Sequence, residues 1–173
     1  KIQWDKYLAL EKSGVDVTEY LLAYFLNEPS EYAKKYIQQI AREKKLKVVV
    51  LPYQREKSNW FDKVEDAGPV EFVKYLKHAA AICTDSFHGT AFAVNYQVPF
   101  FTFERQYGSA GKQSSRIISL LELVGLTERF NPKEELIGKD MNFTISEDVL
   151  QKERKKAISY LTKSLQGVMD VYE

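Results

Sequence analysis

His88 has the clearest potential for chemistry in this chain, because it follows polar residues that come directly after an apolar segment. The apolar run 79–83 leads into the polar residues 84–86, and then into His88, Gly89 and Thr90. Parallel α/β sheets bind ligands at the loops that follow their strands. An imidazole at such a place can hold a negatively charged ligand, donate a proton, or do both.

The neighbours of His88 are of types that would support such a site. Ser86 and Thr90 offer hydroxyl donors, and Gly89 allows the backbone to approach a ligand closely. Asp85 can orient the imidazole, fix its tautomer, or bond to the backbone. A bound anion would favour the charged imidazole. A histidine that packs at a helix start without a function would give the same local pattern, so both interpretations stay open.

Three cations follow the next apolar segment and can reach the same edge of a sheet. Arg105 and Lys112 belong to the Gly- and Ser-rich segment 104–115, and Arg116 stands at the start of a predicted helix. Arginine is the better bidentate partner for a carboxylate or phosphate. We therefore add Arg105 and Arg116 to the predicted substrate-binding residues.

Other sites are not indicated by the sequence. It contains no glycine-rich dinucleotide fingerprint and no phosphate loop ending in Gly-Lys-Ser/Thr, and Gly108 and Gly111 alone are weak evidence. It has no Cys/His cluster with metal-ligand spacing and no Gly-x-Ser-x-Gly elbow. We expect no metal and no bound cofactor.

The elements that must position His88 alternate between apolar strands and amphipathic helices. This order predicts an α/β fold with a Rossmann-like, open, mainly parallel sheet flanked by helices. The predicted strands are Tyr20–Leu26, Lys47–Tyr53, 79–83 and Phe100–Phe103, and the predicted helices are Glu31–Lys44, 69–80 and a small-residue segment at Ala91–Val94.

The rest of the sequence predicts two more helices, and we divide the whole chain into three parts. Ser114 or Ser115 is expected to cap a helix ending at Gly125, and a short strand is expected near Phe130. A terminal helix is predicted from Ser146 to about Met169. Its predicted apolar stripe is Val149, Leu150, Ala157, Ile158, Leu161 and Leu165. We assign 1–18 to a linker or helix from a missing N-terminal half, 19–145 to the Rossmann-like domain, and 146–173 to the C-terminal helix.

Composition favours a globular protein over other classes. The chain has 173 residues, 45% of them hydrophobic, and a net charge of +1, so we expect no nucleic-acid partner. Cys83 is the one cysteine and lies in an apolar run, which fits a reduced core thiol. No stretch approaches the length of a membrane span. The chain begins at Lys1 without Met, which we interpret as the start of a fragment.

Two segments resemble the polysaccharide pyruvyl transferase family. They are GPVEFVKYLKHAAAICTDSFHGTAFAVNYQVPFFTF, at 68–103, and SSRIISLLELVGLTERF, at 114–130, and together they cover roughly a third of the chain. The resemblance implies a two-domain fold like that of GT-B glycosyltransferases, of which this chain is similar to the C-terminal half. It also implies transfer of pyruvate from phosphoenolpyruvate onto two hydroxyls of a saccharide, as a cyclic ketal.

The resemblance also implies roles for single residues. His88 matches the motif histidine, which implies contact with phosphoenolpyruvate and acid chemistry. Ser86 and Phe87 stand where some members carry Arg and Leu, so ionic binding at Ser86 is not expected. Arg116 matches a recurrent arginine of the family.

The implied partners are phosphoenolpyruvate, a saccharide or lipid-linked glycan acceptor, and the missing N-terminal half. Synthesis of exopolysaccharide precursors would place the enzyme in the cytoplasm, with peripheral contact at the inner membrane face left open. Two alternatives remain: the donor domain of a nucleotide-sugar glycosyltransferase, and a non-catalytic anion-binding module.

Overall fold

The computed structural model describes residues 19–51, 60–106 and 114–169. The predicted linker or helix at 1–18, the predicted strand end at 52–53, and Lys112 lie outside the described residues. Along the chain the elements are β1 (Tyr20–Tyr24), α2 (Glu31–Lys44), β2 (Lys47–Leu51), β3 (Lys63–Val64), α3 (Pro69–His78), β4 (Ala81–Thr84), α4 (Phe87–Tyr96), β5 (Phe100–Thr102), α5 (Ser115–Val124), the short 3-10 helices η1 (Thr127–Arg129) and η2 (Glu134–Leu136), and α6 (Thr144–Met169).

The strands form one sheet in the order β3-β2-β1-β4-β5, and every neighbouring pair is parallel. The chain first builds outward from β1 through β2 to β3, and then crosses back to place β4 on the other side of β1. This order is that of the first five strands of the dinucleotide-binding fold. The prediction of a Rossmann-like, parallel α/β sheet is therefore confirmed.

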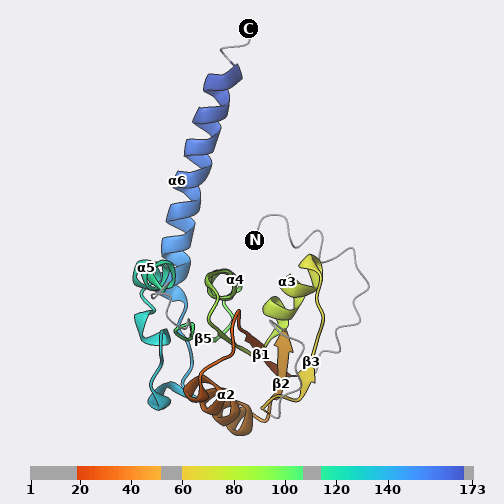
Figure 1. Cartoon of the computed structure of the whole chain (residues 1–173). Coiled ribbons are helices and arrows are strands. Elements are labelled where there is room, and N and C mark those ends of the chain that lie inside the picture. Colours follow the sequence, from red (N-terminus) through yellow and green to blue (C-terminus); the bar gives the residue numbers. More distant parts are fainter. Residues whose placement is uncertain (1–18, 52–59, 107–113, 170–173) are drawn as a thin grey trace.

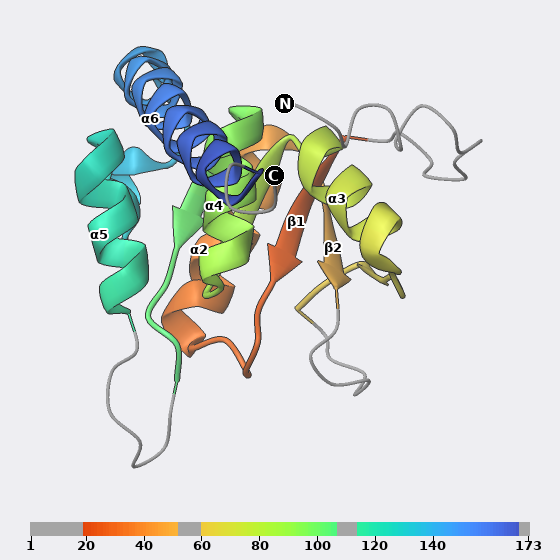
Figure 2. The ribbon, with the colours of Figure 1, turned by 90° about the horizontal axis from the view of Figure 1, so that it is seen from above.

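The sheet is covered on both faces, as Figures 1 and 2 show: α2 lies on one face, and α3 and α4 lie on the other. Side chains alternate between two cores along each strand. Leu21 and Ala23 pack on the α2 side. Tyr20 and Leu22 belong to the core shared with the helices of the opposite face. Burial on both faces explains why the strands read as continuous apolar runs.

Helix ends are set by local signals. The Ser30 hydroxyl accepts a hydrogen bond from the Ala33 N–H at 3.1 Å and caps α2. Pro69 stands in the first turn of α3. Gly125 ends α5 at a φ of 70°, a left-handed conformation that glycine adopts without strain. The predicted cap at Ser114 differs, since that residue precedes α5 but its side chain makes no capping hydrogen bond.

Two further expectations need correction. Strand β3 lies inside the polar segment 54–67, whose sequence favours a loop or a short irregular helix. The strand was not predicted because Lys63 and Val64 are both exposed and carry no apolar alternation. The loop before the Ala91–Val94 segment is shorter than predicted, since α4 already begins at Phe87. His88, Gly89 and Thr90 therefore lie in the first turn of α4.

Asn131 makes hydrogen bonds along the β5 edge of the sheet. A strand was predicted in this region, near Phe130. Phe130 forms a single parallel bridge with Thr102 instead of a strand. The Asn131 N–H then donates to the Thr102 carbonyl at 2.8 Å, and the Asn131 Oδ1 accepts the Glu104 N–H at 2.9 Å. Asn131 has a φ of 44°, in the left-handed region that asparagine tolerates better than most residues.

Helix α6 begins at Thr144 rather than Ser146, and only its first part packs on the body. Val149 and Leu150 are half-buried, whereas Ile158, Leu161 and Leu165 are exposed. The predicted apolar stripe of α6 is therefore buried only in the first turns of the helix. Beyond them it is exposed, because the helix projects away from the domain (Figure 1). Within the described residues, no helix combines the length and the apolar character that crossing a bilayer requires.

Candidate functional site

The sheet has a topological switch point between β1 and β4. Their last residues, Tyr24 and Thr84, are partners in the ladder. After β1 the chain turns to α2 on one face, and after β4 it turns to α4 on the other. In open α/β sheets the connections separate at such a point, and ligands bind in the crevice outside the carboxyl ends of the two strands. The His88 segment borders this crevice, because it follows β4 directly.

Ser86 joins β4 to α4. Its hydroxyl accepts the Gly89 N–H at 3.4 Å, and its carbonyl accepts both the N–H and the hydroxyl of Thr90, at 3.0 and 2.9 Å. The Thr90 hydroxyl also contacts the Thr102 hydroxyl at 3.2 Å. Both Ser86 and Thr90 are completely buried. Their hydroxyls therefore hold the first turn of α4 in place and have no accessible surface for a ligand in this conformation.

His88 is exposed in that first turn. Its ring stands edge-on to the ring of Phe87, with the centroids 5.8 Å apart. The Arg116 guanidinium lies over the same Phe87 ring, 5.5 Å from its centroid, from the start of α5. Phe87 thus contacts both the His88 imidazole and the Arg116 guanidinium and brings them to one place. These three predicted site residues are brought together by the fold.

A groove runs along this cluster between α4 and α5. It has a volume of about 400 Å³ and is lined by Phe87, Ser115, Arg116, Ser119, Leu120 and Leu123. A separate hollow of about 470 Å³ lies between α2 and Trp60, on the opposite face of the sheet from α4. Among the described residues no group of three or more His, Cys, Asp or Glu side chains is placed to hold a metal ion.

Gly89 allows close packing between α4 and β4, whereas the sequence suggested that it would allow a ligand to approach the backbone. A Cβ at this position would stand 2.6 Å from the Thr84 Oγ1 and 3.2 Å from the Thr84 Cβ and Cγ2. The Thr84 hydroxyl donates to the Tyr24 carbonyl at 2.5 Å and accepts the Ser86 N–H at 3.0 Å, so it is firmly placed. The absence of a side chain at Gly89 therefore lets α4 pack closely on β4. This packing also fixes the position of His88, which precedes Gly89 in the same helical turn.

Asp85 ties three strand ends together. Its carboxylate accepts the Leu26 N–H at 2.8 Å, just after β1, and the Arg105 Nε at 3.2 Å, just after β5. An Arg105 terminal nitrogen also donates to the Asp85 carbonyl at 3.1 Å. Burial raises the pKa of Asp85 above its ordinary value, and the Leu26 N–H and the Arg105 charge oppose that rise. Asp85 is not placed by any recorded hydrogen bond to orient His88.

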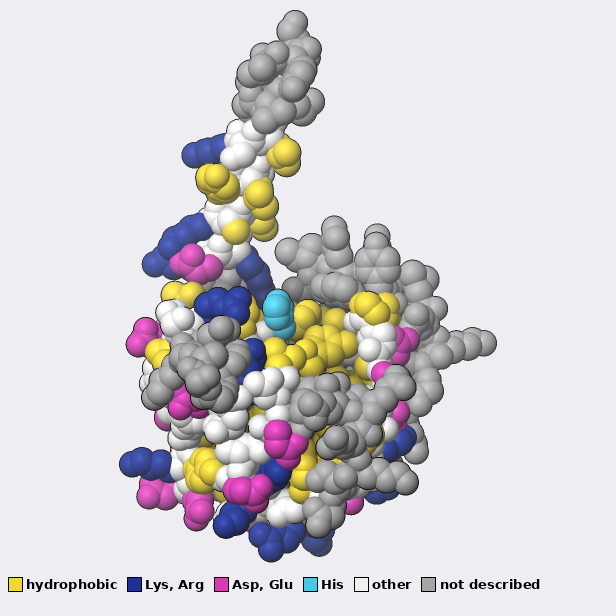
Figure 3. All heavy atoms as spheres, in the orientation of Figure 1, with side chains coloured by type: hydrophobic (Ala, Val, Ile, Leu, Met, Phe, Trp, Pro, Cys, Tyr) yellow, Lys and Arg dark blue, Asp and Glu magenta, His cyan; other side chains and the backbone are white. Residues whose placement is uncertain are grey.

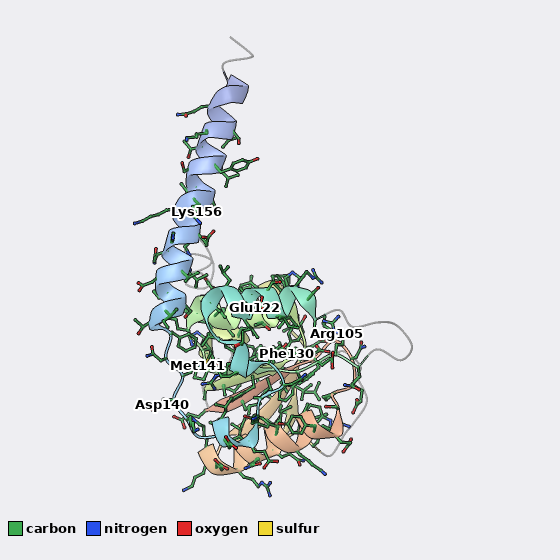
Figure 4. All side chains as sticks on the ribbon, turned by 90° about the vertical axis from the view of Figure 1, so that its left-hand side faces the viewer. Arg105, Glu122, Phe130, Asp140, Met141 and Lys156 are labelled. Atoms are coloured by element: carbon green, nitrogen blue, oxygen red, sulfur yellow. The ribbon has the colours of Figure 1, made fainter. Side chains whose placement is uncertain are left out.

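Arg105 is therefore engaged by a buried carboxylate, whereas Arg116 is exposed. Figure 4 shows Arg105 at the end of the domain away from Met141 and Asp140, which lie near the base of α6. The structure places Arg105 at the carboxyl end of the sheet, as predicted for a residue that follows a strand. Its pairing with Asp85 gives it a structural task that the sequence did not indicate.

Tyr24 is a site residue that the sequence did not single out. It ends β1 at the switch point and is half-buried, with its ring edge-on to Phe72 at 4.9 Å. Burial raises the pKa of its phenol, while the Ser86 hydroxyl beside it acts in the opposite direction. The phenol is therefore neutral at physiological pH and can donate a hydrogen bond. The sequence shows that Tyr24 lies in an apolar strand, but it does not show that β1 and β4 are adjacent in the sheet.

The sheet order and the exposed imidazole at the carboxyl end of β4 define a Rossmann-like domain with a candidate ligand site at its switch point. The family model "Polysaccharide pyruvyl transferase" matches residues 5–107, more than half of the 173-residue chain. The chain belongs to the polysaccharide pyruvyl transferase family, which is a family of transferases. The matched range includes His88 and Arg105 and ends before Arg116.

Comparisons with individual proteins add little to this assignment. Among curated proteins none matches the chain. Among solved structures, the chain is similar to a protein of Listeria monocytogenes described as a UDP-N-acetylglucosamine 2-epimerase, with 12% identity and a TM-score of 0.39. The similarity covers 76% of this chain and 43% of that one, so this chain spans less than half of the other's length.

Proposed function

We propose that the crevice at the switch point binds phosphoenolpyruvate and that the chain takes part in transferring its pyruvyl group to a saccharide. The observation that carries the proposal is the position of His88 within the family match: it is exposed, in the first turn of α4, at the carboxyl end of β4. The remaining steps follow from the chemistry of this substrate.

Phosphoenolpyruvate carries a carboxylate and a phosphate, so its site needs several donors and cations. The first turn of α4 supplies the N–H groups of Phe87 and His88, which have no acceptor within the helix, together with the positive end of the helix dipole. Arg116 adds a guanidinium over the Phe87 ring. Tyr24, whose phenol lies beside Ser86, adds a neutral hydroxyl at the end of β1. We assign anion binding to this set.

The reaction requires one proton at carbon and the loss of phosphate. Protonation of the methylene carbon makes a methyl group and leaves positive character on the adjacent carbon. A first sugar hydroxyl bonds to that carbon, the bond to the phosphate oxygen breaks, and a second hydroxyl closes the ketal. The two hydroxyl protons are balanced by the proton taken up at carbon and the one carried away by phosphate. We assign the proton donation to the His88 imidazole.

The same proposal covers the remaining participants. The acceptor is a saccharide or a lipid-linked glycan, and the surface that binds it comes from a second, N-terminal half facing the carboxyl edge of the sheet. No cofactor is required, because phosphoenolpyruvate itself supplies the group that is transferred. We place the reaction in the cytoplasm, with contact at the inner membrane face.

Calorimetry with phosphoenolpyruvate tests the binding step on this chain. We expect saturable binding that weakens about 10- to 100-fold in His88→Ala, the range for a lost hydrogen bond to a charged group. His78→Ala is the matched control, because His78 is exposed at the end of α3, and it should bind as the wild type does. Binding of UDP-N-acetylglucosamine in place of phosphoenolpyruvate would instead favour a nucleotide-sugar glycosyltransferase.

The catalytic step is tested in the full-length protein by phosphate release from phosphoenolpyruvate with candidate glycans. His88→Ala should lower turnover by about 10²-fold or more, the range for a lost general acid. Near-normal turnover of that variant would remove His88 from the chemistry. Binding of phosphoenolpyruvate without phosphate release on any glycan would favour a non-catalytic anion-binding module.

A further inference from the structure

The peptide group between Asp85 and Ser86 is held from both of its ends. An Arg105 terminal nitrogen donates to the Asp85 carbonyl at 3.1 Å, and the Ser86 N–H donates to the Thr84 Oγ1 at 3.0 Å. This peptide group leads into α4, because Ser86 is the N-cap of that helix. Arg105 and Thr84 together therefore fix the direction in which α4 leaves the sheet.

The same guanidinium also holds the Asp85 side chain. The Arg105 Nε donates to the carboxylate at 3.2 Å, so one planar group bonds both the main chain and the side chain of a single residue. A two-point contact of this kind defines an orientation as well as a distance, which a single ammonium group does not. The Asp85 side chain is 2% exposed and the Arg105 side chain 19%, so water competes little for these bonds.

The Asp85 carboxylate also reaches the end of β1. It accepts the Leu26 N–H at 2.8 Å, and the neighbouring Asn27 side-chain N–H donates to the Gln106 carbonyl at 2.7 Å. The segments that follow β1, β4 and β5 are thus joined to one another by side chains. Because these segments border the switch point, the Arg105–Asp85 pair fixes the backbone around the candidate ligand site.

The first turn of α4 carries the donors that this pair would position. The N–H groups of Phe87 and His88 have no acceptor within the helix, and the His88 side chain is exposed beside them. Figure 3 shows a histidine side chain at the surface, with basic side chains on one side of it and hydrophobic ones on the other. Hydrogen bonds weaken steeply as their angle departs from linear, so a tilt of this turn would weaken its grip on an anion.

We propose that Arg105 and Asp85 are positioning residues for the anion site, which set the direction of the first turn of α4 without contacting the ligand. This inference rests on the proposed binding of phosphoenolpyruvate at the switch point. The alternative is the role predicted from the sequence, in which Arg105 binds the anion directly. Asp85 would then only compete with the ligand for the guanidinium.

The sign of the effect of Asp85→Asn separates these two roles. The asparagine Oδ1 can still accept the Leu26 N–H, whereas its Nδ2 is a donor and cannot accept from Arg105. If Arg105 bound the ligand directly, loss of a negative charge beside an anion would tighten phosphoenolpyruvate binding. If the pair positions α4, the same substitution should weaken binding about 10-fold, the lower end of the range for a lost hydrogen bond to a charged group.

Calorimetry with phosphoenolpyruvate measures this effect in a double-mutant cycle. Arg105→Gln and the double variant should each bind about as weakly as Asp85→Asn, because all three lack the same contact. Arg105→Lys keeps the charge but loses the two-point contact, so its binding should also stay about 10-fold weaker than wild type. Tighter binding by Asp85→Asn, or full affinity in Arg105→Lys, would overturn the proposal.

Arg154→Gln is the matched control for the lost charge. The Arg154 side chain is 24% exposed, close to the value for Arg105, and it bonds the Asn95 Oδ1 at the other end of α4. This variant should bind phosphoenolpyruvate as the wild type does. Melting temperatures show which variants are folded at the assay temperature, and Arg105→Lys alone decides the question if Asp85→Asn does not fold.

Backbone amide NMR of the ligand-free chain tests the positioning itself. The Phe87 and His88 amide signals should shift in Asp85→Asn and in Arg105→Gln, and should stay in place in Arg154→Gln. Unmoved signals in the first two variants would overturn the proposal whether or not a ligand binds. If the signals shift but the wild-type chain does not bind phosphoenolpyruvate, the proposed function fails, and the pair still sets the direction of the turn.

Discussion

Replacing Gly89 by alanine tests whether the position of His88 depends on close packing of α4 against β4. The new methyl group would stand 2.6 Å from the Thr84 Oγ1, well inside van der Waals contact. The Thr84 side chain has no room to move, because it is fully buried and its hydroxyl bonds both the Tyr24 carbonyl and the Ser86 N–H. Either α4 moves outward or both of these hydrogen bonds are lost.

The sign of the effect separates packing from helix propensity. Propensity alone predicts that alanine stabilises the helix by about 1 kcal/mol relative to glycine. Overpacking costs about 1–3 kcal/mol, and the two hydrogen bonds are worth about 1 kcal/mol each. We expect the free energy of unfolding to fall by about 2–3 kcal/mol, which corresponds to a melting temperature lower by roughly 4–12 °C for a domain of this size.

Urea unfolding followed by tryptophan fluorescence measures this change, and a double-mutant cycle supplies the control. Thr84→Ala removes the Oγ1 and Cγ2 atoms that the new methyl group would meet. Gly89→Ala should therefore cost at least about 1 kcal/mol less in that background than in the wild type. A Gly89→Ala protein as stable as the wild type, or more stable, would refute the reasoning.

Three further predictions concern the same edge of the sheet. Burial raises the folded-state pKa of Asp85 above its ordinary value of 3.8, so its stabilising effect is complete below that value and is lost as pH rises through the folded pKa. The stability advantage of wild type over Asp85→Asn should therefore shrink as pH rises above 3.8, and an advantage that grows would contradict this. Burial also raises the pKa of Cys83, so a disulfide reagent should label it at least about 10³-fold slower than a free thiol until urea unfolds the chain, and rapid labelling of the folded protein would show that the β4 core opens. Tyr24→Phe should weaken phosphoenolpyruvate binding about 10- to 100-fold in calorimetry, the range for a hydrogen bond to a charged group, with the melting temperature as a check on folding; unchanged affinity would remove Tyr24 from the site.

The order of strands and helices was predictable, except for β3, because each signal was local. The bounds of Glu31–Lys44 follow from the Ser30 cap and the helical spacing of its apolar residues, and Gly125 ends α5 for a reason that the sequence states directly. The start of α4 was less accessible. Ser86 can begin a helix or sit in a loop, and what decides is the pair of hydrogen bonds that its carbonyl receives from Thr90.

The candidate site was predictable in its location but only partly in its members. His88, Phe87 and Arg116 meet because α4 and α5 are neighbours, which the strand order makes natural. The burial of Ser86 and Thr90 could not be derived, since hydroxyl side chains suit an exposed loop and a packed helix start equally well. Likewise, a local pattern cannot show that Asp85 bonds to Leu26 and Arg105, which are distant in the sequence.

Asn131 has a consequence for how the chain behaves in concentrated solution. A terminal strand of a parallel sheet presents unpaired backbone groups that can recruit a strand from another molecule. By binding the Thr102 carbonyl and the Glu104 N–H, Asn131 occupies groups along β5 that an incoming strand would need. One left-handed residue thereby protects this border of the sheet against aggregation, at a position where alanine would lose the side-chain half of the protection and strain the backbone as well.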